Sequence, residues 1–291
     1  MLVKLISRFI LLLLIFGLAT SFFKKKKEAP GMIKVSNNFY ADETEISNKH
    51  WREFIYWQNQ VYGESSKKLL PDTLTWLACN QLSTKDREAL VELYLKHPYY
   101  QDHPVVGVGY EEAVKYCKWR TDRVLEHLLI RAGKIQVHRN QDSSNCFTIE
   151  RYFDGNYFNY QPDMDFRYFS YRLPTPQEFN NLLAIKTSIQ KRKIFGRKEL
   201  FPLCFNSFPN HPEKTETCIE LFSVYMSQKN EIGLIALDNN VSELTSQEGI
   251  CKGHNYTNDT TLFDANNQLL YTKPTCYIGF RCVGEWVKWN N

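Results

Sequence analysis

The sequence predicts one irregular domain of the α+β class, and three observations support this fold class. Segments with helical periodicity alternate with short apolar segments up to Phe179, whereas short strands and loops dominate beyond Gly196. Aromatic residues make up 14% of the chain, and such large side chains can hold long loops against a core. A chain of 291 residues without internal repeats is long enough to bury a sizeable core.

The first elements follow from periodicity and capping residues. A strand is expected over 33–41, and an amphipathic helix over 48–60, where Trp51 and Phe54 begin an apolar face spaced by three and four residues. Ser47 is suited to cap that helix. A second helix is expected to begin at Ser83 or Thr84 and to run toward position 95.

Later elements are read in the same way. A short buried strand is expected over 103–108, followed by a long helix over 110–132. The polar, asparagine-rich and aromatic segment that follows resembles a long insertion rather than a separate domain. Thr175 and Pro176 predict another helix start, and the clearest ordered pieces near the end are 233–245 and 278–283.

Residues 1–27 have the character of a targeting or anchoring segment. Lys4 and Arg8 precede an apolar stretch over 9–19, which is shorter than the roughly 20 residues of a spanning helix. That length favours an export signal. The four lysines at 24–27 resist translocation, so a short uncleaved membrane anchor is the alternative. Either reading places the protein in the periplasm or cell envelope, exported or membrane-anchored.

Charge and motif content narrow the function classes. The net charge of +4 equals the charge of the lysine run, so the remainder has no basic stripe and no nucleic-acid partner is expected. The eight cysteines permit disulfides behind an export signal, but none forms a CxxC pair. No HExxH, Gly-x-Ser-x-Gly or phosphate-loop motif occurs, so motifs give no sign of an enzyme.

Four landmarks in one order give a more specific signal between residues 33 and 284. They are Glu45-Ile46-Ser47-Asn48 with Trp51 and Phe54; His103-Pro104-Val105-Val106-Gly107-Val108-Gly109-Tyr110 with Tyr116-Cys117 and Trp119; Tyr171-Arg172-Leu173-Pro174-Thr175; and Asn240-Val241-Ser242-Glu243 with Lys252-Gly253 and Ile278-Gly279-Phe280-Arg281-Cys282-Val283. Together they resemble the formylglycine-generating-enzyme family of sulfatase-modifying factors. The resemblance implies an irregular fold of C-type-lectin-like architecture, with residues 133–170 as the insertion.

The resemblance also locates the family's chemistry. Its enzymes oxidise a substrate cysteine with molecular oxygen and bind copper(I) through two cysteines five positions apart, because soft thiolates select this ion. The corresponding positions here are Asn258 and Phe263, so copper is not expected and the chain is expected to be a pseudoenzyme. An oxidase with relocated cysteines, Cys251 and Cys276, is the alternative.

Two further expectations come from the resemblance alone. Cys117 and Cys282 match family positions that form a disulfide. Asn240, Val241 and Glu243 match residues around a structural calcium, an ion that prefers such oxygen ligands. The sequence departs from the family pattern at Asn239, Ser242 and Leu244, and a solvated turn is the alternative to a calcium site.

A narrower resemblance concerns the possible biological setting. Residues 94–98 and 117–124 are similar to the Bacteroidetes gliding-motility and type IX secretion lipoproteins, although the early lipid-modified cysteine of those proteins is missing here. The expected function is therefore a non-catalytic envelope binding or scaffold protein whose partners are envelope proteins or a secretion or motility complex; a paralogue with another task is the alternative. A carbohydrate or peptide recognition module is a further alternative, with Tyr157 and Phe158 of the insertion as its contact surface.

Overall fold

A computed structural model describes most of the chain after the N-terminal segment. The described residues are 29, 31–185, 203–204, 218–227, 229–257, 259, 262–264, 266 and 268–289. Residues 1–27, for which an export signal or anchor is expected, and Asn258 lie outside them. Within the described part, no helix has the length and apolar character needed to cross a membrane.

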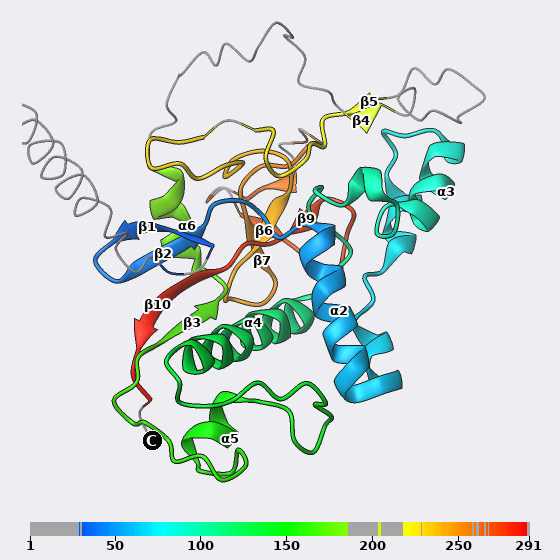
Figure 1. Ribbon diagram of the computed structural model, residues 1–291. Helices are drawn as coiled ribbons and strands as arrows, with labels where there is room; N and C mark the ends of the chain where they lie inside the picture. Colours follow the sequence, from blue (N-terminus) through cyan, green and yellow to red (C-terminus); the bar gives the residue numbers. More distant parts are fainter. Residues whose placement is uncertain are drawn as a thin grey trace, which may run out of the picture.

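The first sheet joins both ends of the domain (Figure 1). Its four strands are antiparallel and have the order β1 (Met32–Ser36), β2 (Phe39–Asp42), β10 (Val283–Val287), β3 (Tyr168–Arg172). The last strand of the chain is therefore an inner strand. The prediction of a single strand over 33–41 is wrong, because the chain reverses at Asn38 and forms two strands. Asn38 has a φ of 57°, a left-handed conformation that asparagine tolerates better than most residues.

The second sheet is built from much shorter strands. Its order is β8 (Leu269–Leu270), β7 (Ile250–Lys252), β6 (Ser242–Leu244), β9 (Ile278–Gly279), with β6 and β9 parallel. Strands β6, β9 and β10 begin inside the two late segments that were expected to be ordered. A separate two-stranded ladder pairs β4 (Leu203–Cys204) with β5 (Cys218–Ile219).

The helices begin where the capping residues predict. Ser47 accepts a hydrogen bond from the His50 amide at the start of α2 (Asn48–Tyr62). Ser83 accepts one from the Asp86 amide at the start of α3 (Thr84–Leu93). The remaining helices are η1 (Gly63–Leu69), η2 (Thr73–Ala78), η3 (Pro98–Tyr100), α4 (Tyr110–Arg131), α5 (Ile149–Phe153) and α6 (Pro176–Leu183). The predicted α+β fold class is confirmed by this mixture of helices and small sheets.

The segment 103–108 is buried and extended, but it is not a strand of either sheet. It is held by separate contacts: the Val105 amide donates to the Ile46 carbonyl at 2.8 Å, and the Gly107 amide donates to the Thr275 carbonyl at 3.0 Å. Because these partners belong to two different segments, no continuous ladder forms. The apolar pattern therefore predicted burial correctly and strand pairing incorrectly.

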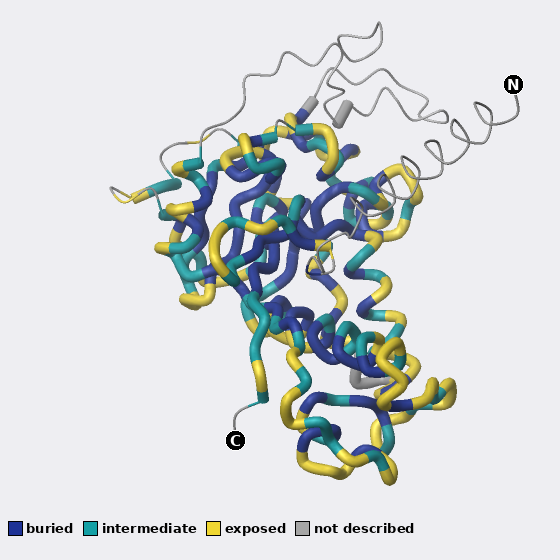
Figure 2. Tube along the Cα trace, turned by 60° about the vertical axis from the view of Figure 1, so that its left-hand side comes forward, coloured by how far each residue is buried: buried dark blue, intermediate teal, exposed yellow. Residues whose placement is uncertain are grey.

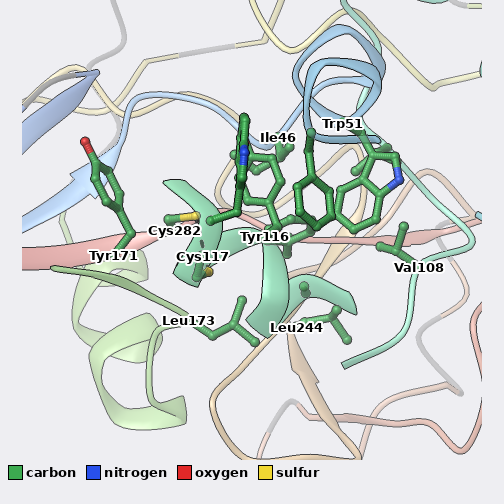
Figure 3. Close-up of a cluster of buried hydrophobic side chains, with 14 of the residues drawn as sticks. Ile46, Trp51, Val108, Tyr116, Cys117, Tyr171, Leu173, Leu244 and Cys282 are labelled. Atoms are coloured by element: carbon green, nitrogen blue, oxygen red, sulfur yellow. Dashed lines mark hydrogen bonds between the residues drawn. The ribbon is translucent and has the colours of Figure 1, made fainter. Parts of the chain in front are cut away.

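The main core lies between α2, α4 and the two sheets. Trp51 of α2 stacks on Tyr116 of α4 at 5.6 Å between ring centroids (Figure 3). Phe280 meets Trp51 edge-on at 5.9 Å. Such aromatic pairs add directional attraction to the burial of apolar area. The landmark residues of the sequence thus form the centre of the fold.

The predicted insertion has a small core of its own below α4 in the view of Figure 1. Figure 2 shows buried segments inside this lower part, surrounded by exposed turns. Leu125 and Leu129 of α4 pack there against Phe147, Tyr152 and Tyr157. The insertion is therefore fastened to the domain through the outer face of α4.

Candidate functional site

A fully buried ion pair lies next to the second sheet. Arg281 and Glu243 each have 0% exposed side chains. The Arg281 Nε donates to both Glu243 carboxylate oxygens at 2.9 and 2.8 Å, and Nη2 donates to Oε1 at 2.6 Å. Nη2 also donates to the carbonyls of Ile235 and Ala236 at 2.8 and 3.1 Å. The guanidinium therefore fixes the loop before β6 to β6 itself.

A second buried carboxyl group completes this cluster. Glu45 is 0% exposed, and its Oε1 accepts a hydrogen bond from Asn240 Nδ2 at 3.0 Å. Burial raises the pKa of Glu45 to about 8, although the positive charge of Arg281 opposes the increase. The raised pKa favours the protonated form of Glu45, and Glu243 is the carboxylate that binds Arg281 through both of its oxygens.

The residues expected to bind calcium lie in this cluster but do not fit a calcium site as they are arranged. Both oxygens of Glu243 face Arg281, and the Asn240 side-chain carbonyl accepts the Phe222 amide at 2.8 Å. A second cation beside the guanidinium would be repelled by it. The described residues also contain no group of three or more His, Cys, Asp or Glu side chains arranged to hold a metal.

Of the two positions expected to correspond to the family's catalytic cysteines, Phe263 is described. Its half-buried ring lies 4.8 Å from the imidazole of His254, whose Nδ1 is 2.7 Å from Asp238 Oδ1. Gly253, which precedes His254, has a φ of +77°, and a Cβ there would lie 2.7 Å from the Leu237 carbonyl oxygen. The loop geometry therefore requires a glycine, while an aromatic pair occupies the space next to it.

Two thiols that were expected to pair do lie face to face. The Sγ atoms of Cys117 and Cys282 are 3.5 Å apart as free, buried thiols, one on α4 and one just before β10 (Figure 3). Burial, together with the neighbouring Cys117 thiol, raises the pKa of Cys282 well above its ordinary value. The disulfide bond between them stays a prediction.

The relocated catalytic pair, Cys251 with Cys276, is not brought together. Cys251 is 0% exposed and packs in the main core, and burial raises its thiol pKa well above the ordinary value. Cys276 belongs to a different cluster, which also contains Cys79. Neither thiol of the expected pair is presented to a substrate.

Comparison with known families settles the classification of this chain. The model of the sulfatase-modifying factor enzyme 1-like domain matches residues 14–286. The chain belongs to this family. No curated protein matches it. Among solved structures, it is similar to the crystal structure of CarF, with 16% identity over 88% of this chain and 95% of that one; the TM-score of 0.39 is too low to add to the assignment.

The insertion of this sulfatase-modifying-factor-like domain presents only one of its two expected contact residues. Tyr157 is 1% exposed and belongs to the insertion's own core, so the expected surface of Tyr157 and Phe158 needs correction. Phe158 is 47% exposed and stacks on His138 at 4.0 Å between ring centroids. A run of aromatic residues without regular periodicity does not reveal which rings point inward.

Two cavities on this sulfatase-modifying-factor-like domain were missed by the sequence reasoning. One, of about 410 Å³, lies beside the buried cluster and has Asp42, His50, Glu53 and Arg120 among its polar lining residues. The Arg120 Nη1 donates to Asp42 Oδ2 at 2.8 Å, which fixes the position of both groups. Burial lowers the pKa of His50, which favours its neutral imidazole. No local pattern connects residues that meet from β2, α2 and α4.

The other cavity is a groove of about 390 Å³ between α4, β3 and the insertion. Its lining contains both aromatic rings and charged groups, among them Tyr110, Lys118, Tyr168, Arg172 and Trp289. Some charged groups are already oriented, since Lys118 Nζ donates to Glu150 Oε1 at 2.6 Å. Rings beside fixed charges are suited to hold a polar chain or ring from a partner.

Proposed function

We propose that this sulfatase-modifying-factor-like domain is a non-catalytic binding or scaffold protein of the cell envelope. The observation that carries the proposal is the pairing of Phe263 with His254, since Phe263 is expected to correspond to a catalytic cysteine of the family. Phenylalanine supplies no thiolate, and all six cysteines whose side chains are described are buried. A copper(I) site that leaves room for a substrate thiolate needs accessible sulfur ligands.

The groove between α4, β3 and the insertion is the contact surface that this proposal favours. It contains aromatic rings for packing and the cations Lys118 and Arg172 for orientation. Both cations already have carboxylate partners, Glu150 for Lys118 and Glu178 for Arg172, so their positions are defined before a partner binds. Envelope proteins or a secretion or motility complex are the proposed partners, and residues 1–27 would bring the domain to the membrane.

The enzyme question has a direct test. The purified protein is incubated with copper(I), oxygen and a peptide that carries a sulfatase cysteine motif, with a catalytic member of the family as positive control. We expect no aldehyde from this chain. Aldehyde formation at a rate comparable to the control would overturn the non-catalytic proposal and restore the oxidase alternative.

The binding role is tested separately by recovery of cross-linked partners from envelope fractions. Tyr168→Ala removes a groove ring, and we expect the recovered partner to decrease severalfold. The matched control is Tyr56→Ala, which removes a ring that is 67% exposed on α2, away from the groove. If both variants recover the same partner in equal amount, the groove is not the binding surface.

A further inference from the structure

The end of η2 and the segment before β9 each place a cysteine in the same apolar cluster. Cys79 is the cap residue that follows η2, Cys276 lies two residues before β9, and both lie against Tyr256. Both are free and nearly inaccessible, with 5% and 2% of their surfaces exposed. The Tyr256 hydroxyl lies 3.8 Å from Cys79 Sγ and donates to the Cys276 carbonyl at 3.1 Å. The Tyr256 hydroxyl therefore bridges the two cysteines.

A further hydrogen bond joins the loop after η2 to the segment that follows β7. Gln81 Nε2 donates to the Thr257 carbonyl at 2.8 Å. Around the thiols, Trp76 and Leu90 of the η2–α3 region pack in one apolar cluster with Val241 and Tyr256. This interface is therefore the place where the η2–α3 region is attached to the second sheet.

The surroundings also favour reaction at one of the two sulfurs. The hydrogen bond from the Cys276 thiol lowers the pKa of Cys79 to about 7, while burial opposes the decrease. The same contact raises the pKa of Cys276. Cys79 is buried but is followed by the exposed residues Asn80 and Gln81, so local opening of this loop admits a reagent to the thiol. Since a thiolate is the nucleophile in thiol–disulfide exchange, Cys79 is the sulfur that attacks first.

We propose that Cys79 and Cys276 are a disulfide-forming pair that links the η2–α3 region covalently to the second sheet. The oxidant is a disulfide, either a small molecule or the active site of an oxidoreductase. The Cys79 thiolate attacks one sulfur of that disulfide and releases the other as a thiolate, forming a mixed disulfide. Cys276 loses its proton and attacks the Cys79 sulfur, which releases the second thiolate. One protein disulfide forms, and one reagent disulfide is reduced to two thiols.

This cross-link is independent of the proposed binding role and of the Cys117–Cys282 pair. That pair connects α4 to the residue before β10 within the main core, whereas Cys79 and Cys276 lie in a separate apolar cluster. A bond here restrains the η2–α3 region, which otherwise depends on packing and a few hydrogen bonds. It lowers the tendency of that region to open locally.

The test uses the full-length chain, treated in its folded state with oxidised glutathione. Unreacted thiols are alkylated after unfolding, and peptides are mapped by mass spectrometry without reduction. We expect a linked pair of peptides containing Cys79 and Cys276, and loss of both alkylated thiols. The oxidised protein should also be cleaved severalfold more slowly between residues 63 and 100 in limited proteolysis.

Two variants separate this reaction from general oxidation. Cys79→Ser should abolish the cross-link and the protease resistance, whereas Cys146→Ser, a change at another buried cysteine, should leave both intact. Because the mapping is done on the unsubstituted chain, it does not depend on the folding of a variant. Recovery of Cys79 and Cys276 as alkylated thiols, or a link from either one to a different cysteine, would overturn the proposal.

Discussion

Replacing Arg281 by methionine tests whether a guanidinium, rather than a metal ion, neutralises the buried Glu243. Methionine keeps much of the side-chain volume and removes the charge and all donors. The substitution leaves Glu243 in the core without a cation, and it leaves the carbonyls of Ile235 and Ala236 without the hydrogen bonds that Nη2 donates. Glu45 cannot compensate, because it is a neutral acid or an additional anion.

The expected magnitude follows from these contacts. Breaking a buried ion pair by removing one partner costs about 3–5 kcal/mol, and each carbonyl left without its donor adds about 1 kcal/mol or more. The total is about 5 kcal/mol or more, a large part of the stability of a typical domain. At about 2 °C per kcal/mol for a chain of this size, the melting temperature should decrease by at least about 10 °C.

Urea unfolding followed by tryptophan fluorescence measures this cost, since Trp51 and Trp76 are fully buried. The double variant Arg281→Met with Glu243→Leu removes both charges and should be more stable than Arg281→Met alone by about 2 kcal/mol. Millimolar calcium should not restore Arg281→Met, and a chelator should not destabilise the unsubstituted chain. A cost below about 1 kcal/mol for Arg281→Met, or its rescue by calcium, would refute the reasoning.

Three further predictions concern pH, backbone conformation and capping. Burial lowers the pKa of His103 to about 4, so on acidification the imidazole is protonated in the unfolded chain before it is protonated in the folded one. The free energy of unfolding should therefore decrease by about 3 kcal/mol as pH falls from 6.5 to 4. His103→Gln should flatten this slope in urea titrations. Gly253→Ala should cost about 2–4 kcal/mol, because the new Cβ would clash with the Leu237 carbonyl oxygen. Gly155 has a similar φ of +73° but open space where a Cβ would lie, so Gly155→Ala should cost about 1 kcal/mol. Equal costs for the two variants would contradict the clash at Gly253. Glu178→Ala should cost about 1–2 kcal/mol in thermal melts, because Glu178 caps α6 and binds Arg172 through both oxygens, whereas exposed Gln177→Ala should change little.

Helix starts and core residues were predictable because their causes are local. Ser47, Ser83 and Thr175 each accept a backbone amide at the start of a helix, as a short hydroxyl or acidic side chain does in many sequences. Trp51 and Tyr116 are spaced on their helices so that one face is apolar, and both are buried. These features need no knowledge of the rest of the chain.

Features that depend on long-range contacts were not predictable. The sequence around Glu243 does not indicate that Arg281 binds both of its carboxylate oxygens. This ion pair is the reason why the expected calcium site fits the structure poorly. The contact of Cys79 with Cys276 likewise depends on how the η2–α3 region packs on the second sheet. Eight cysteines allow many pairings, and sequence spacing alone does not choose among them.

The inner position of β10 has a consequence for how the protein is made. This strand pairs with β2 on one side and with β3 on the other, so the first sheet has a gap until the final residues of the chain are available. The sheet therefore cannot close before β10 has been synthesised. Contacts of such long sequence separation also make folding slow. The segments up to β3 should consequently stay without their complete sheet until this late strand inserts between β2 and β3.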